Sequence, residues 1–204
     1  MSAIASIILA AGRARRFHAG PDDTKVLAEL AGKRLVRHVA EAALNSRARP
    51  VLIVTGQAAD KVEAALSDLD VTFIRNPDPD AGLSRSLDLG LKALPAEISG
   101  AVILLADMPY VTAALIDRLV AAFAAAPKKP QAVVPVHAGR RGNPVLLGRT
   151  IFADAMSLEG DRGARTLLEA PGAVVVECPI DDEAVAIDID TQEALARLNT
   201  RDRT

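Results

Sequence analysis

Residues 4–12 read Ile-Ala-Ser-Ile-Ile-Leu-Ala-Ala-Gly, an apolar run that closes on small residues. Basic side chains follow at Arg13, Arg15, Arg16 and Lys25. Small residues let a backbone approach a ligand closely, and exposed N–H groups together with fixed cations bind phosphate. The stretch predicts a strand that delivers a basic loop to a polyphosphate; the alternative is a buried strand followed by a solvated loop. Neither a Walker A motif nor the glycine pattern of a dinucleotide fold occurs, which indicates a different phosphate chemistry.

Composition narrows the class of protein and of partner. The 204 residues are 50% hydrophobic, which predicts a single domain over residues 1–204. A net charge of -2 and an aromatic content of 2% argue against a nucleic-acid surface and favour a small-molecule ligand. The one cysteine, Cys178, excludes an internal disulfide and is expected in a buried strand. No apolar run has the length of a membrane span or the form of a signal peptide, so we expect a cytoplasmic location.

The first two thirds of the chain alternate short apolar runs with amphipathic segments. Strands followed by helices at this spacing predict a mostly parallel sheet covered on both faces, with ligands at the carboxyl ends of the strands. The expected strands are Ile4–Leu9, Val51–Thr55, Val71–Ile74, Val102–Leu105 and Ala132–Val136. The expected helices are Leu35–Leu44, Ala59–Leu66, Leu83–Leu94 and Ala114–Ala124.

The pattern changes after residue 136. The turn Gly139-Arg140-Arg141-Gly142 separates Val133–Val136 from Val145–Leu147, which predicts a hairpin and at least one antiparallel strand. Two further strands are expected, near Val174–Cys178 and Ala186–Ile189, and a last helix at Gln192–Leu198, capped by Thr191.

Carboxylates stand where two of these predicted strands end. Asp107 follows the apolar run 102–106, and a carboxylate at the end of a central strand is a suitable ligand for Mg²⁺. Asp188 and Asp190 flank Ile189, and strand alternation would place both carboxylates on one face. Together they predict a Mg²⁺ site that also contacts phosphate oxygens. The alternatives are a turn before Pro109 for Asp107, and the start of the last helix for Asp190.

Two glycine-containing turns are candidate ligand contacts. The stretch Gly82-Leu83-Ser84-Arg85-Ser86-Leu87 opens a helix with hydroxyls in its first turn, which suits either an anion or nucleotide contact or helix capping. Gly142-Asn143-Pro144 follows two arginines and forms either a contact for a second ligand or a solvated hairpin tip. No zinc motif and no Gly-x-Ser-x-Gly motif occurs in the sequence. Cations with strand-end carboxylates instead fit metal-assisted transfer at a phosphorus centre.

In their order along the chain, these residues resemble the MobA-like nucleotidyltransferase family, and within it the molybdenum cofactor cytidylyltransferase subgroup. The resemblance covers nearly the whole chain. The matching segments are Leu9-Ala10-Ala11-Gly12 with Arg16 and Lys25, Gly32-Lys33, Gly82-Leu83-Ser84, Asp107-Met108-Pro109, Arg141-Gly142-Asn143-Pro144-Val145, Gly160-Asp161-Arg162-Gly163-Ala164-Arg165 and Asp188-Ile189-Asp190-Thr191.

The resemblance implies a three-layer, Rossmann-like α/β nucleotidyltransferase fold, whose mostly parallel sheet contains an antiparallel strand. It implies a catalytic role for Arg16, Lys25 and Asp107, and Mg²⁺ ligation by Asp107 and Asp190. The implied nucleotide-binding residues are Leu9, Ala10, Ala11, Gly12, Arg16, Lys25, Asn76, Gly82 and Ser84. The implied acceptor-binding residues are Arg141, Gly142, Asn143, Pro144, Asp161 and Arg165.

The implied reaction transfers CMP from CTP to the phosphate of molybdopterin cofactor, with release of pyrophosphate and with a molybdoenzyme as recipient of the product. Ala11 favours CTP, because the family's guanosine enzymes carry Gly at the second small position of this loop. The chain departs from the family pattern at His18, Gln57 and Ala106. Three alternatives stay open: another phosphorylated acceptor such as a sugar phosphate, GTP as donor, and a non-catalytic carrier of the finished cofactor.

Overall fold

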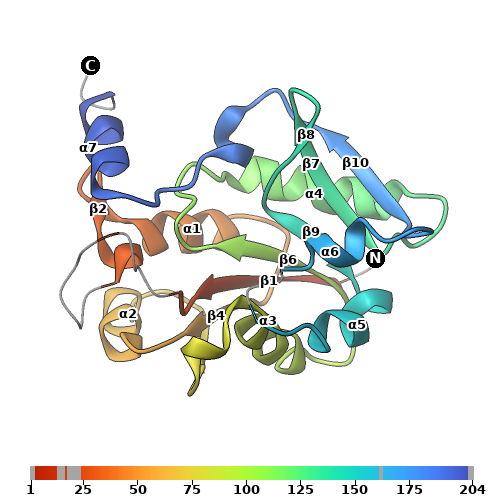
Figure 1. Ribbon diagram of the computed structural model, residues 1–204, viewed down its shortest axis with the longest axis horizontal. Helices are drawn as coiled ribbons and strands as arrows, with labels where there is room; N and C mark the ends of the chain where they lie inside the picture. The colour runs from red at the N-terminus through yellow and green to blue at the C-terminus, as the bar shows by residue number, and fades with distance from the viewer. Residues whose placement is uncertain (1–2, 13–16, 18–23, 161–162, 202–204) are drawn as a thin grey trace.

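The computed structural model describes residues 3–12, 17, 24–160 and 163–201, and it places a mixed sheet between two layers of helices (Figure 1). The strands lie in the order β10-β7-β9-β6-β1-β4-β5, with β8 on β7. Their bounds are β1 Ala3–Ala10, β4 Val51–Thr55, β5 Thr72–Arg75, β6 Ile98–Leu105, β7 Ala132–His137, β8 Arg140–Arg141, β9 Val145–Gly148 and β10 Val175–Pro179. A separate two-stranded sheet pairs β2 (Glu29–Leu30) with β3 (Lys33–Arg34).

Parallel pairing dominates the main sheet, as the alternation of strands and helices predicts. β1 pairs in parallel with β4 and β6, β4 with β5, and β10 with β7. The exception is β9, which lies antiparallel between β6 and β7. The predicted hairpin is therefore confirmed, and so is the predicted α/β architecture with a mostly parallel sheet that contains an antiparallel strand.

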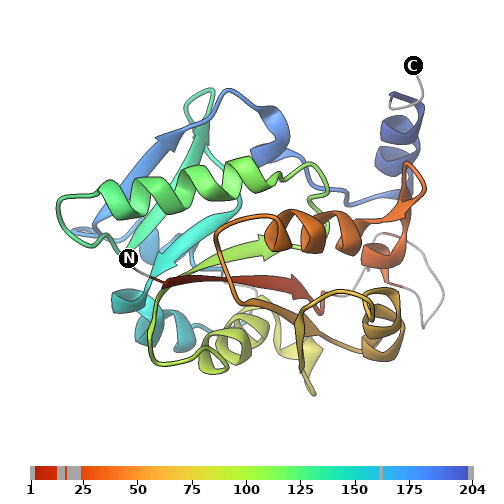
Figure 2. The ribbon, with the colours of Figure 1, turned by 180° about the vertical axis from the view of Figure 1, so that it is seen from behind.

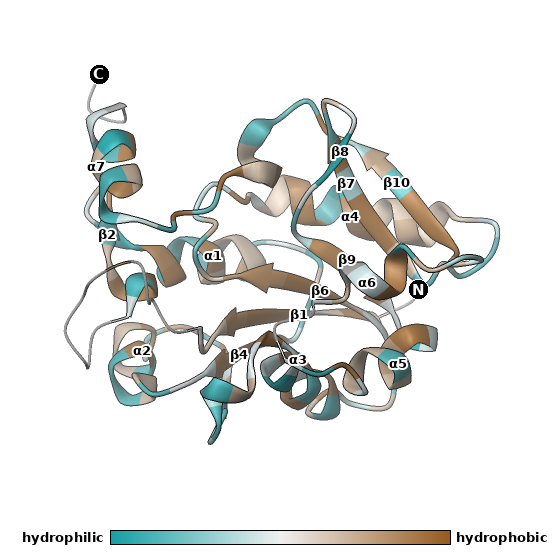
Figure 3. Ribbon diagram, viewed as in Figure 1, coloured by the Kyte–Doolittle hydropathy of each residue, from teal (hydrophilic) through white to brown (hydrophobic). Residues whose placement is uncertain are grey.

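Helices cover both faces of the sheet, because its central strands are apolar on both sides. β1 is buried from Ile4 to Ala10. One apolar core contains residues of α1 (Leu35–Leu44), α2 (Ala59–Ala65) and α4 (Ala113–Ala125). The opposite core contains residues of α3 (Leu83–Lys92), α5 (Phe152–Met156) and α6 (Arg165–Leu168). Figure 2 shows α1 and α4 together above the sheet from behind, and Figure 3 shows the hydrophobic residues gathered on the strands between the layers.

The strand predicted at Ala186–Ile189 is wrong. Residues Glu183–Ala186 form a 3-10 helix, whose first turn is capped by the Asp182 carboxylate accepting from the Ala184 N–H at 2.9 Å. The backbone of Ile189 then donates one hydrogen bond, from its N–H to the Asp107 carbonyl at 3.0 Å. Asp107 lies two residues beyond the end of β6, so this contact does not extend the sheet.

The last helix forms as predicted and stands beside the small sheet. Helix α7 spans Gln192–Arg201, and the Thr191 hydroxyl caps it by accepting from the Ala194 N–H at 3.1 Å. Cys178 is buried in β10, as expected. No helix in the described part of the chain combines the length and the apolar character that crossing a membrane requires.

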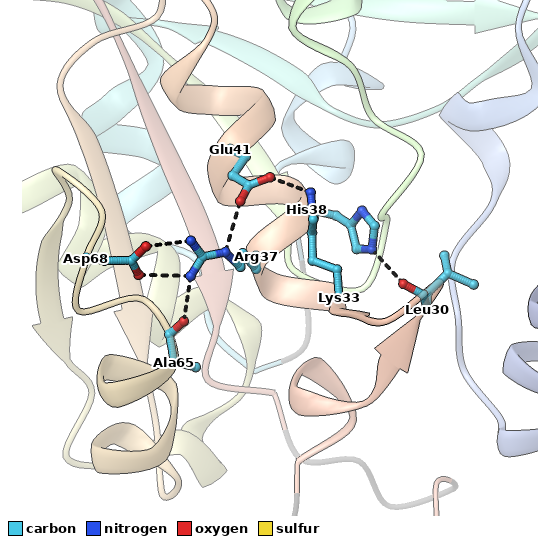
Figure 4. A network of polar contacts seen from close by, with 7 residues as sticks. All are labelled: Leu30, Lys33, Arg37, His38, Glu41, Ala65 and Asp68. Atoms are coloured by element: carbon cyan, nitrogen blue, oxygen red, sulfur yellow. Dashed lines mark hydrogen bonds and ion pairs between the residues drawn. The ribbon is translucent and has the colours of Figure 1, made fainter.

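A network of ion pairs fixes α1 against the end of α2 (Figure 4). The Arg37 guanidinium donates to both carboxylate oxygens of Asp68, at 2.9 and 2.6 Å, and to Glu41 at 2.9 Å. These bonds favour the ionised carboxylate and lower the pKa of Asp68 to about 2. The network is partly exposed to solvent, with 28% of the Arg37 side chain and 62% of the Asp68 side chain accessible.

Candidate active site

A cavity of about 350 Å³ opens at the carboxyl ends of β1 and β6. Both arrowheads point to the same side of the molecule in Figure 1, because the two strands are parallel. Ligands of open α/β sheets bind at this edge. The lining residues come from the first loop, the segment before α3 and the end of β6: Leu9, Ala11, Gly12, Lys25, Val26, Pro79, Asp80, Gly82, Leu83, Ser86, Leu105 and Asp107.

A hydrogen bond fixes the backbone just before the small-residue loop enters the cavity. The Ala106 N–H donates to the Leu9 carbonyl at 3.2 Å, which ties the loop to β6. Leu9, Ala10 and Ala11 are buried, and the chain becomes exposed at Gly12. The predicted phosphate contact Arg16 falls outside the described residues, as do Arg13 and Arg15.

Lys25 lies between two carboxylates that are far apart in the sequence. Its ammonium is 2.5 Å from Asp107 Oδ2 and 2.7 Å from Asp190 Oδ1. The side chains of Lys25 and Asp107 are each 16% exposed, and that of Asp190 is 48% exposed. Burial lowers the pKa of Lys25, but the charge of Asp107 and the hydrogen bonds to both carboxylates outweigh burial and raise the pKa above its ordinary value. The ammonium is therefore charged at neutral pH.

Asp188 is a third carboxylate close to Lys25, Asp107 and Asp190. The pKa of Asp188 is raised by partial burial and then by repulsion from Asp190 and Asp107. Asp188 and Asp190 do not alternate along a strand as expected, because this segment forms a loop. The loop places Asp190 within hydrogen-bond distance of Lys25.

Asp107 and Asp190 fit a divalent cation by the chemistry of their oxygens. Each already has one oxygen within 2.7 Å of the same ammonium nitrogen, so both carboxylates reach a single positive charge. Carboxylate oxygens are the ligands that Mg²⁺ prefers. Among the described residues, no group of three or more candidate ligands surrounds one point. Two protein carboxylates match the usual Mg²⁺ arrangement, in which phosphate and water complete the coordination.

The start of α3 and the glycine before it form one wall of this cavity. Gly82 has a positive φ of 91°, a conformation that favours glycine, and Leu83 and Ser86 follow it along the wall. Asn76 and Ser84 are buried and are not among the described lining residues. Asn76 instead supports the wall: its amide donates to the Ser86 hydroxyl at 3.0 Å and its carbonyl oxygen accepts from the Asp78 N–H at 2.9 Å.

The sequence indicated the hydroxyls of both Ser84 and Ser86 as candidate ligand contacts, but the implied nucleotide-binding residues included Ser84 and not Ser86. Asp80, which also lines the cavity, was not predicted. Side chains two positions apart on a helix, such as Ser84 and Ser86, point in different directions. The packing of α3 therefore decides which of the two hydroxyls faces the first cavity. Ser84 is fixed differently, since its N–H donates to the Gly160 carbonyl at 3.1 Å.

A second cavity of about 220 Å³ adjoins the first and shares the side chains of Leu9, Leu83 and Leu105 with it. Polar side chains reach it from Arg141 and Asn143. Its other described lining residues are Leu87, Ile103, Val134, Gly142, Val145, Gly163, Ala164 and Leu168. The structure thus brings the predicted acceptor segments 141–143 and 163–164 to one place.

Contacts with neighbouring segments orient the Arg141 side chain. Its Nε donates to Glu177 Oε1 at 2.9 Å, and its Nη1 donates to the Leu168 carbonyl at 3.3 Å. The backbone beside it is fixed by the bond from the Asn143 N–H to the Val185 carbonyl at 2.9 Å.

The remaining predicted acceptor residues lie elsewhere or are not described. Pro144 is buried and is not among the described lining residues. Asp161 and the side chain of Arg165 lie outside the described part of the structure.

The sequence matches the model of the MobA-like NTP transferase domain over residues 6–175. The chain belongs to this family. The match contains the first loop, Lys25, Asp107 and the segment 141–145, so both cavities lie within the family domain.

Three known proteins are similar to this chain. A bifunctional protein GlmU from Kineococcus radiotolerans is 35% identical over 123 residues, which is 59% of this chain; the chain spans about a quarter of the length of that relative (25%). A nicotine blue oxidoreductase from Paenarthrobacter nicotinovorans is 28% identical and is matched over 96% of both chains. The crystal structure of Rv0371c from Mycobacterium tuberculosis superposes with a TM-score of 0.83 at 25% identity, over 98% of both chains. A complex of Rv0371c with manganese has also been solved, and it superposes with a TM-score of 0.79.

Proposed function

We propose that this MobA-like nucleotidyltransferase transfers CMP from CTP to the terminal phosphate of molybdopterin cofactor, forming the cytosine dinucleotide and pyrophosphate. The proposal rests on one observation, which is that two cavities adjoin and share the lining residues Leu9, Leu83 and Leu105. A transfer between two bound substrates needs both reacting groups held next to each other. The cavity with Lys25 and Asp107 is assigned to CTP, and the cavity with Arg141 and Asn143 to the acceptor.

The lining of the second cavity supports a flat heterocyclic acceptor over a sugar phosphate. Among its described residues, only Arg141 and Asn143 bring polar side chains, and the rest of the wall is glycine, alanine, valine, leucine and isoleucine. A sugar presents hydroxyl groups on every side, and apolar walls leave such groups without hydrogen bonds. An aromatic ring buries its faces against these walls, while Arg141 suits an anionic group at its edge.

The charges around the first cavity support transfer at a triphosphate. Lys25, together with Arg16, is assigned to neutralise the charge that develops on the leaving phosphates. Asp107 and Asp190 would hold a divalent cation, which would bind the triphosphate and reduce its negative charge. With both carboxylates engaged in this way, the Lys25 ammonium would be available to contact the phosphates of the nucleotide.

The chemical step needs no strong base. A phosphate monoester is an anion near neutral pH and serves directly as the nucleophile. One of its oxygens bonds to the α-phosphorus of CTP, the bond from that phosphorus to the bridging oxygen breaks, and pyrophosphate leaves with the electron pair. The role of the protein is to position the two phosphates and to stabilise charge.

A substrate screen tests the proposal. The protein is incubated with Mg²⁺, molybdopterin cofactor and each of the four ribonucleoside triphosphates, and the dinucleotide product is detected by mass. The cytosine dinucleotide with stoichiometric pyrophosphate is expected, and Asp107→Asn is the negative control. Product with GTP alone would overturn the donor, and product with sugar phosphates alone would overturn the acceptor. Tight binding of the finished dinucleotide without pyrophosphate release would show a carrier for a molybdoenzyme.

A further inference from the structure

Gly56 lies directly against the loop that forms the first cavity. It follows Thr55, the last residue of β4, and Thr55 pairs with Ala10 of β1. A Cβ atom at position 56 would lie 2.8 Å from the Ala11 carbonyl oxygen, 3.0 Å from its Cα and 3.1 Å from its Cβ. Favourable contacts between carbon atoms need about 3.5 Å or more, so even a methyl group does not fit without a shift.

The backbone on the Gly56 side is fixed. The Asn76 N–H donates to the Thr55 carbonyl at 2.8 Å, and the Ala59 N–H donates to the Gly56 carbonyl at 3.0 Å. These bonds tie residue 56 to β5 and to the start of α2. A side chain at this position would therefore displace Ala11 rather than Gly56.

Ala11 has little room to move without changing the cavity. The residue is 6% exposed and lines the first cavity, and Leu9, two residues earlier, is tied to β6 through Ala106. Gly56 itself is not among the described lining residues of that cavity. Any effect of residue 56 on a ligand must pass through the position of Ala11 and Gly12.

We propose that Gly56 is a positioning residue for the nucleoside triphosphate. Its missing side chain lets the Ala11-Gly12 backbone lie against the end of β4, which sets the depth of the nucleotide cavity. The inference rests on the first cavity being the nucleotide site, and it is independent of which base or acceptor the enzyme uses.

The test compares two glycine variants that create the same local clash in different places. In Gly56→Ala the new methyl group meets a backbone carbonyl oxygen at 2.8 Å, that of Ala11. In the control Gly100→Ala, within β6, it also meets a backbone carbonyl oxygen at 2.8 Å, that of Leu147. Gly100 lines neither cavity among the described residues. Both variants lose stability, but only Gly56→Ala changes the loop.

Binding of each nucleoside triphosphate to the full chain is measured by titration calorimetry with Mg²⁺ and without acceptor, and folding is checked by thermal denaturation. Gly56→Ala is expected to weaken binding of the best wild-type nucleotide about tenfold or more, since small misplacements at a site are costly. Gly100→Ala is expected to keep the wild-type dissociation constant. Equal binding by wild type and Gly56→Ala would overturn the inference, and so would equal weakening by both variants.

A double variant keeps the test decisive if Gly56→Ala folds poorly. Ala11→Gly removes the contact to the Ala11 Cβ at 3.1 Å and retains those to its carbonyl oxygen and Cα, but it widens the backbone conformations by which the loop can move those two atoms away. The Ala11→Gly, Gly56→Ala protein is therefore expected to fold better and to bind the nucleotide more tightly than Gly56→Ala. Binding as weak as in Gly56→Ala would contradict a role that acts through Ala11. If wild type prefers a nucleotide other than CTP, the proposed donor fails while this comparison still holds.

Discussion

Replacing Lys25 with methionine removes the positive charge between Asp107 and Asp190 and retains most of the side-chain volume. Exposed ion pairs contribute about 0–1 kcal/mol, and breaking a buried pair costs about 3–5 kcal/mol. The Lys25 and Asp107 side chains are each 16% exposed and Asp190 is 48% exposed, which places this site between the two cases. We expect Lys25→Met to lower the unfolding free energy of the metal-free protein by about 2 kcal/mol. For a chain of this length that corresponds to a fall in Tm of about 4–8 °C.

The same change should strengthen metal binding in the absence of nucleotide. In the wild type a cation must displace the ammonium from both carboxylates, and in Lys25→Met the carboxylates have lost that competitor. A ligand at 100 times its Kd stabilises a protein by about 2.7 kcal/mol. Added Mn²⁺ or Mg²⁺ should therefore raise the Tm of the variant more than that of the wild type. The variant should nevertheless be the less active enzyme, because it lacks the ammonium that binds the triphosphate. Its KM for CTP should rise, and its KM for the acceptor should equal that of the wild type.

Thermal denaturation with and without Mn²⁺, together with direct titration of Mn²⁺, measures both effects. Lys33→Met is a matched control, because Lys33 pairs with Glu41 at 2.6 Å on the surface, with 41% and 30% of the two side chains exposed. This control should lose less than about 1 kcal/mol and show the wild-type response to metal. The reasoning is refuted if Lys25→Met is as stable as the wild type without metal, or if its Tm rises no more than the wild-type Tm when metal is added.

Three further outcomes are expected. Asp107→Asn should fold cooperatively and lose at least about a hundredfold in turnover, measured as pyrophosphate release at saturating Mg²⁺; near-normal turnover would remove Asp107 from the proposed metal site. Ala11→Gly should raise the ratio of kcat/KM for GTP over CTP by about tenfold, because one methyl-sized change in a pocket contributes ~1–3 kcal/mol of discrimination; an unchanged ratio would separate Ala11 from base choice. For Asp68, whose folded pKa of about 2 lies below the unfolded value near ~3.9, the stabilisation by Arg37 is present above pH 4 and is lost as the pH falls toward 2. Urea unfolding should therefore show Asp68→Asn less stable than wild type at pH 6, with the difference closing near pH 2; a difference independent of pH would contradict the ion-pair assignment.

Most of the sheet could be predicted from local sequence because its strands are short, apolar and separated by amphipathic helices. β1, β4 and β6 are buried on both faces, and such strands appear in the sequence as continuous apolar runs. The hairpin of β7 and β9 was visible for a similar reason, since a glycine turn lies between two apolar runs. The segment 186–189 carries the same local signal and still forms no strand: its chain leaves a 3-10 helix at Ala186, and the Ile189 N–H bonds to Asp107, beyond the end of β6. Pairing depends on where the rest of the fold places a segment, and a local pattern does not contain that information.

The sequence by itself determined the kinds of groups at the site: a small-residue loop, a lysine and strand-end carboxylates. Only the tertiary structure decided which of them meet. The Lys25 bond to Asp190 joins positions 165 residues apart, and no local pattern encodes that distance. Gly56 likewise carries no ligand-binding signal, and its closeness to Ala11 exists only because β4 pairs with β1. Local propensities depend on neighbours along the chain, whereas a site at the ends of parallel strands is assembled from segments that the sheet alone brings together.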